Sequence, residues 1–172
     1  IVFERSAPRH EKINFQAGWE SFGVLDLKVG MTLNVNSENE YIYKYKSIGG
    51  YETSSSNMMK LNPGNDTFWL KSTSANQVNM LVDYTLHNEV TFDTGYEVNI
   101  TVKEGVNVFG TLIKKMSLSA NNDATLINKA SLLKYDAVNR KYSSVSYGEE
   151  LENKVGYTIE AYKTGIIKAV IS

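Results

Sequence analysis

The chain has 172 residues, and its 18 Lys and Arg against 19 Asp and Glu give a formal net charge of −1. This balance provides no electrostatic basis for binding nucleic acid, and a hydrophobic content of 42% is too high for a disordered chain. No apolar run approaches the length of a membrane-spanning helix, and the absence of cysteine excludes disulfides and thiolate chemistry.

The first residues differ in character from the rest of the chain. The sequence starts at Ile1 without a Met, as expected of a processed product from which any signal peptide has gone. Apolar residues at both ends of the segment 1–15 suit a strand that pairs either within the chain or with another subunit. We therefore expect an N-terminal extension over residues 1–14 and, since no linker divides the remainder, one domain over residues 15–172.

Strands dominate the predicted secondary structure because apolar and polar residues alternate along much of the chain. Tyr96, Val98 and Ile100, for example, alternate with polar residues, which places the apolar side chains on one face of a strand. Clusters of Gly, Asn, Asp and Pro between such runs are typical of turns. This pattern predicts an all-β fold, an antiparallel β-sandwich of the jelly-roll or Ig-like kind. The expected strands lie near 12–16, 23–36, 39–48, 66–73, 77–86, 89–93, 96–103, 106–116, 142–147, 156–163 and 165–171.

One segment breaks the alternation. Leu126, Ile127, Ala130 and Leu133 follow helical spacing, and the Asn and Asp residues before them are suitable N-caps. A short helix is expected near 124–134, although the end of this segment fits the continuation of a strand equally well.

The last strand, 165–171, is apolar on both of its faces. Such a strand is usually buried on each side, and as an edge strand it would promote aggregation. We therefore expect it to have neighbours on both flanks.

Residues suited to catalysis or metal binding are few. The chain has two histidines, His10 and His87, and Asp83 lies about 13 Å from His87 if both belong to one strand. That separation exceeds the hydrogen bond that a catalytic base needs with the carboxylate that orients it. No zinc or EF-hand motif occurs, and the loop 62–66 is most simply a turn. We expect no catalytic residue, no metal site, no cofactor and no enzymatic activity.

A row of tyrosines suggests a second type of site. Tyr41, Tyr43 and Tyr45 share one face of a predicted strand, and the lysines between them favour the tyrosine face pointing inward as part of the core. Alternatively, these tyrosines and Trp69 form a platform on which a sugar ring stacks. The residues around Trp69 are apolar on both faces, which favours burial.

Two asparagines match the acceptor sequence for N-linked glycosylation. Asn65 lies in a predicted loop, and Asn99 lies on the polar face of a predicted strand. Both are candidate glycosylation sites of an extracellular protein.

Two pieces of the first half match the motifs of a known family. The residues FQAG at 15–18 and GVLDLKV at 23–29 resemble the Phe-x-Ala-Gly-Thr-Leu-Asp-Leu opening of the TasA/camelysin family of secreted fibre proteins. The residues KLNPGN at 60–65 resemble that family's Leu-Lys-Pro-Gly-Asp turn. Five residues interrupt the opening motif, Asn65 replaces the acidic residue of the turn, and the resemblance ends near residue 86.

The resemblance implies a jelly-roll β-sandwich that is exported and assembles into extracellular biofilm fibres or bundling pili of bacteria or archaea. In such fibres the N-terminal segment of one subunit adds a strand to the next. Here the implied donor is the segment 1–15. Its apolar interface residues are Ile1, Val2, Phe3, Ile13 and Phe15.

The sequence therefore predicts a structural subunit of a filament at the cell surface, a homo-oligomer of open symmetry with a role in adhesion or the biofilm matrix. Two alternatives stay open. One is a carbohydrate-binding β-sandwich with a glycan partner, and the other is a viral or phage surface jelly roll that forms closed oligomers.

Overall fold

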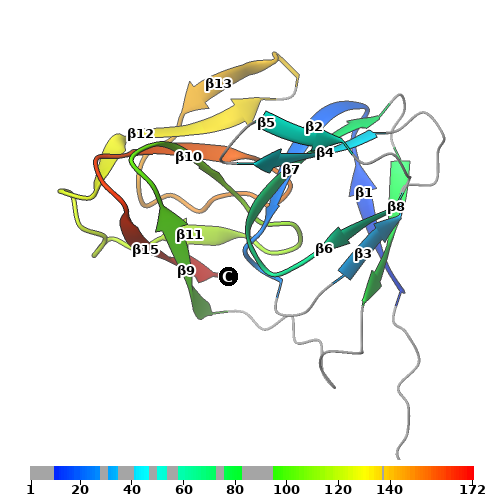
Figure 1. Ribbon diagram of the computed structural model, residues 1–172, viewed down its shortest axis with the longest axis horizontal. Coiled ribbons are helices and arrows are strands. Elements are labelled where there is room, and N and C mark those ends of the chain that lie inside the picture. Colours follow the sequence, from blue (N-terminus) through cyan, green and yellow to red (C-terminus); the bar gives the residue numbers. More distant parts are fainter. Residues whose placement is uncertain are drawn as a thin grey trace, which may run out of the picture.

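The computed structural model consists of antiparallel strands, and no helix occurs among the residues it describes (Figure 1). This confirms the predicted all-β antiparallel fold. The described residues are 10–27, 31–34, 41–46, 50–53, 58–72, 76–82, 95–136 and 138–172.

The strands up to residue 82 form a jelly roll, here called the first roll. Strand β1 pairs with β8, β2 with β7, β3 with β6 and β4 with β5, so that one long hairpin is folded over on itself. Folding the hairpin produces two sheets, with the strand orders β1-β8-β3-β6 and β2-β7-β4-β5. The strands are β1 His10–Phe15, β2 Gly18–Val24, β3 Met31–Asn34, β4 Tyr41–Lys46, β5 Gly50–Thr53, β6 Met58–Leu61, β7 Gly64–Ser72 and β8 Asn76–Val82.

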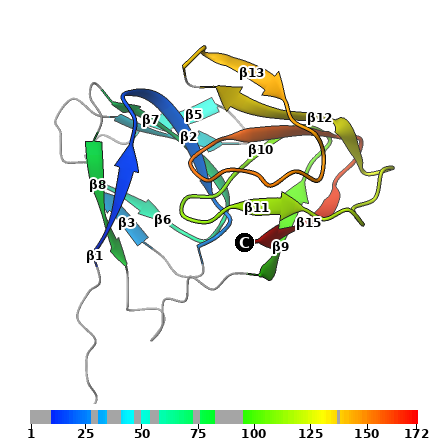
Figure 2. The same cartoon turned by 180° about the vertical axis from the view of Figure 1, so that it is seen from behind.

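The strands from residue 96 onward repeat this plan in a second roll. Its sheets have the orders β11-β15-β9 and β10-β14-β12-β13, and an isolated bridge between Met116 and Leu151 takes the place of an eighth strand. The two rolls lie side by side in both views (Figures 1 and 2). The strands are β9 Tyr96–Val102, β10 Gly105–Phe109, β11 Met116–Leu118, β12 Ile127–Asp136, β13 Lys141–Ser144, β14 Tyr157–Ala161 and β15 Gly165–Ile171.

Each roll encloses its own hydrophobic core, but each core also contains one leucine from the other roll. Leu25, from the loop after β2, is buried in the second core, and Leu112, from the loop after β10, is buried in the first. The described residues thus build two sandwiches that are interlocked at a shared junction. The predicted division into an extension and one domain stays a prediction, because residues 1–9 lie outside the described residues.

The junction is built from backbone contacts around a buried carboxylate. Asp26, 2% exposed, accepts backbone N–H bonds from Leu112, Ile113 and Lys114 at 2.7–2.8 Å. Burial raises the pKa of this carboxyl group, and the backbone hydrogen bonds oppose the rise. Beside it the backbone segments of the two rolls approach so closely that a Cβ on Gly23 would overlap the carbonyl oxygen of Gly110. Glycine is therefore required where the rolls meet.

The helix predicted near 124–134 is wrong. Residues 124–126 form a turn, and the strand β12 begins at Ile127. Of the four residues with helical spacing, Leu126 and Ile127 are buried in the second core, whereas Leu133 is half-buried and Ala130 is exposed. An irregularity in the pairing of β12 with β14 between Asn128 and Leu133 explains the helix-like spacing, because it shifts the alternation of side chains.

Two predicted strands are each interrupted in the structure. The segment predicted as one strand over 23–36 contains the end of β2, the junction turn and β3, and the segment 106–116 contains the end of β10 and a second junction loop. Both breaks fall where one roll crosses to the other. The strand predicted over 89–93 lies outside the described residues.

The final strand, β15, lies between β11 and β9, which confirms that it has neighbours on both flanks. The prediction that β15 is buried on both faces is wrong, because only the face with Ile167, Ala169 and Ile171 lies in the core. On the other face Ile166 is 59% exposed and Val170 is 38% exposed.

Candidate functional site

Strand β1 lies at the edge of its sheet, and among the described strands it pairs with β8 alone. The pairing runs from His10 opposite Leu81 to Phe15 opposite Asn76. Phe15 is 2% exposed, its ring centroid lies 5.7 Å from that of Phe22, and Ile13 packs against the same core. An edge strand thus supplies apolar side chains to the first core.

The predicted donor residues are only partly within the described part of the chain. Ile1, Val2 and Phe3 lie outside it. Ile13 and Phe15 occupy β1 and pair within their own chain. Whether the same strand pairs with another copy stays a prediction.

Tyr43 and Tyr45 of β4 face away from the first core, contrary to the expectation from the sequence. Ile42 is 1% exposed and belongs to the first core, whereas Tyr43 and Tyr45 are half-buried on the opposite face. Lys44 is tolerated on the inner side because its Nζ reaches Asp66 at 3.0 Å near the end of the strand. The side chain of Tyr41 lies outside the described set.

Five aromatic side chains form a continuous row from the first roll to the second. The ring centroids of Trp19 and Tyr43 lie 5.5 Å apart, those of Trp19 and Trp69 6.3 Å, those of Trp69 and Tyr135 4.5 Å, and those of Tyr135 and Tyr142 5.4 Å. Trp69 is half-buried, whereas the apolar residues beside it in the sequence predicted full burial. No local pattern predicts the place of Tyr135 in this row, because its partner Trp69 lies 66 residues away, and Tyr142 joins the row as the residue opposite Tyr135 in the neighbouring strand.

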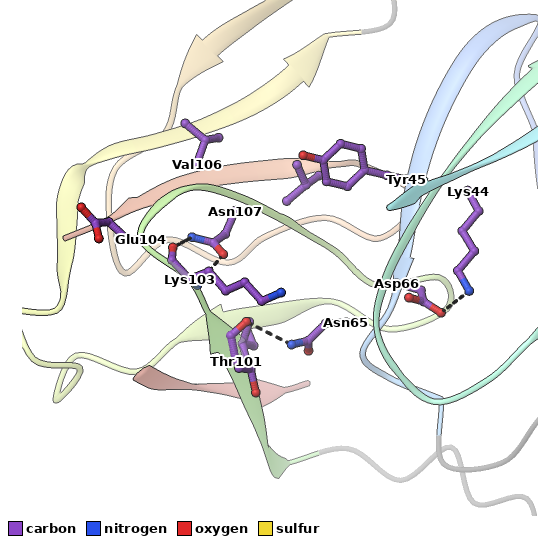
Figure 3. A pocket seen from close by; sticks show the side chains of 11 residues that line it. Lys44, Tyr45, Asn65, Asp66, Thr101, Lys103, Glu104, Val106 and Asn107 are labelled. Atoms are coloured by element: carbon purple, nitrogen blue, oxygen red, sulfur yellow. Dashed lines mark hydrogen bonds and ion pairs between the residues drawn. The ribbon is translucent and has the colours of Figure 1, made fainter. Parts of the chain in front are cut away.

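A cavity of about 500 Å³ opens between the two rolls, beside Tyr45 (Figure 3). Strands β4 and β7 of the first roll form one wall, and β9, β10 and the turn between them form the other. Its lining consists of Lys44, Tyr45, Asn65, Asp66, Ile100, Thr101, Lys103, Glu104, Val106, Asn107 and Val108.

The polar groups that line this cavity include both hydrogen-bond donors and hydrogen-bond acceptors. The ion pair between Lys44 and Asp66 lies on the first roll, and Asn65 Nδ2 donates to the Thr101 carbonyl oxygen at 3.1 Å across the junction. Figure 3 shows the Lys103 side chain extending between the two walls. One aromatic ring surrounded by amide, ammonium and carboxylate groups is suited to a hydroxyl-rich ligand.

The two candidate glycosylation asparagines are both exposed. Asn99 lies on the outer face of β9, opposite Lys168. The Nδ2 of Asn65 is the atom that donates to Thr101, and a glycan attached to it would leave this nitrogen a single N–H.

No group of three or more His, Asp or Glu side chains that could hold a metal ion occurs in the described ranges. Of the two histidines, His10 begins β1 and His87 lies outside those ranges. The described part of the chain also contains no helix long and apolar enough to cross a membrane.

Comparisons with known proteins identify no family for this chain. No family model and no curated protein matches it. Among solved structures, a cupin 2 conserved barrel domain protein from Leptotrichia buccalis is similar over 100% of this chain and 92% of its own length, with 10% identity and a TM-score of 0.29. A TM-score this low supports no conclusion about fold or function.

Proposed function

We propose that the protein is a structural, non-enzymatic subunit of an extracellular filament, assembled head-to-tail by donor-strand exchange. The observation that carries the proposal is the position of β1, an edge strand that contributes Phe15 and Ile13 to the first core. The resemblance of residues 15–86 to secreted fibre proteins supports it from the sequence side.

Strand exchange needs no contact beyond those that β1 already makes. The backbone bonds to β8 and the pocket for Phe15 are the same whether β1 comes from the same chain or from another copy. Such an exchange joins two different surfaces of the subunit, and a contact of this kind that does not close produces an open filament. In this proposal the partner is a second copy, and the location is the cell surface or the biofilm matrix.

Deletion of residues 1–12 tests the proposal. The shortened chain retains Ile13 and Phe15 but loses half of β1 with the segment before it. We expect it to stay monomeric under conditions in which the full chain elongates, as judged by negative-stain electron microscopy and sedimentation. Unchanged fibres would contradict donor-strand exchange by this segment.

A second candidate function is carbohydrate binding in the cavity between the rolls. The observation that favours it is the half-buried ring of Tyr45 beside the polar side chains of Asn65, Asp66 and Lys103. A sugar ring stacks on an aromatic face while its hydroxyl groups bond such side chains.

A glycan array on the full chain separates the two functions. If the cavity binds a sugar, Tyr45→Ala abolishes the signal, while Tyr162→Ala, which removes a tyrosine 52% exposed in the second roll, does not. The absence of any glycan signal for the full chain would overturn this second candidate and leave the filament proposal intact.

A further inference from the structure

One side chain of the second roll holds the end of β1. Lys154, in the loop between β13 and β14, donates from Nζ to the carbonyl oxygen of Asn14 at 2.6 Å. The same ammonium group lies 5.9 Å from the centre of the Phe15 ring, within the range of a cation–π interaction. Both contacted residues end the strand that the filament proposal exchanges.

The loop that carries Lys154 is fixed to its own roll. The backbone N–H of Lys154 donates to the Thr111 carbonyl oxygen at 2.9 Å, and that of Glu152 donates to the Tyr157 hydroxyl at 2.8 Å. Asn153 Nδ2 donates to the Ile113 carbonyl oxygen at 2.8 Å. The loop therefore cannot follow β1 outward, and the contact with Lys154 breaks when the strand leaves.

Glu20 offers Lys154 a second partner. Its Oε1 accepts the backbone N–H of Gln16 at 2.9 Å, but its buried Oε2 has no hydrogen-bond partner among the described residues. Both side chains line one cavity at the junction, and the charge of Lys154 acts on the carboxyl group, whose pKa is raised by burial. A buried carboxylate oxygen without a partner is costly, which favours any state in which Lys154 turns to it.

We propose that Lys154 controls the release of β1: in the seated state it binds Asn14 and Phe15, and in the released state it pairs with Glu20. Asn14 and Phe15 of an incoming β1 from a second copy then take the same place against Lys154. The role toward a second copy rests on the proposed filament function, whereas the hold on β1 within one chain does not.

Amide hydrogen exchange of the dilute full chain tests the hold on β1. Lys154→Met keeps an unbranched side chain of similar length but removes the charge and the donor, so the β1 amides should exchange roughly five- to tenfold faster. Lys163→Met, at an exposed lysine in the turn after β14, is the matched control and should leave β1 unchanged. Equal β1 exchange in Lys154→Met and the wild type would overturn the proposal.

The role of Glu20 is tested by combining variants. In a Glu20→Gln background the released state no longer gains the pairing with Lys154, so Lys154→Met should accelerate β1 exchange more than it does in the wild type. Additive effects of the two substitutions would remove Glu20 from the proposal.

Elongation rates distinguish this inference from the filament proposal. If fibres form by strand exchange, Lys154→Met should elongate faster than Lys163→Met, because the strand is released more often. Elongation of Lys154→Met at the wild-type rate would contradict the control by Lys154 and leave the filament proposal standing. Absence of fibres from the wild type would contradict the filament proposal, while the exchange measurement still reports on Lys154.

Discussion

Two of the contacts that join the rolls, those of Asp26 and of Lys154, differ in burial and in the number of bonds. Asp26 is 2% exposed and accepts three backbone N–H bonds from the other roll. Lys154 makes a solvent-exposed bond to one carbonyl oxygen of β1. Because a buried, multiply bonded group is far harder to release than an exposed one, we expect the rolls to stay joined under conditions in which the proposed release of β1 takes place.

Removal of the Asp26 carboxylate should have the largest effect. Asp26→Ala leaves the backbone N–H groups of Leu112, Ile113 and Lys114 without their acceptor, and that of Leu112 is buried. We expect a loss of about 3 kcal/mol in the free energy of unfolding, measured by urea denaturation. A loss no greater than that of Lys154→Met would contradict the ranking of the two contacts.

A smaller effect is expected at the base of the loop that carries Lys154. Burial raises the pKa of Tyr157 to about 12, so above the ordinary value of 10.0 the unfolded chain loses this proton first. Stability should therefore be full below pH 10 and fall as the pH rises toward 12.

Tyr157→Phe removes this alkaline decline together with the bond from Glu152, which contributes about 1 kcal/mol at neutral pH. Urea denaturation across the alkaline range checks both effects. An equally steep decline in the variant would assign the pH dependence to other tyrosines.

Strand alternation was sufficient to predict the fold class but not the division into two rolls. Alternation reports which face of a strand is buried, and it says nothing about which core receives that face. Leu25 and Leu112 illustrate the limit, because each is apolar in a predicted strand and each is buried in the roll of the other half. The breaks at these crossings were missed for the same reason.

The sites show a similar limit. The alternation predicts that Tyr43 and Tyr45 share one face of a strand, but it does not show whether that face points to the core. Burial of Ile42 on the opposite face decides the direction, although Lys44 lies on the same face as Ile42. Lys154 gave no signal at all, because its partner Asn14 lies 140 residues away. Contacts between the rolls are long-range, and no local pattern encodes them.

The exchange of β1 is tested most directly by a disulfide that ties it to its own sheet. Asn14 and Gln77 are directly opposed in β1 and β8, a spacing suited to a disulfide, and the chain has no other cysteine. In Asn14→Cys/Gln77→Cys, oxidation before assembly should abolish fibres, and reduction should restore them. Oxidation after assembly should instead link neighbouring copies into covalent multimers. Fibres from the fully oxidised chain, at the rate of the reduced one, would contradict the account.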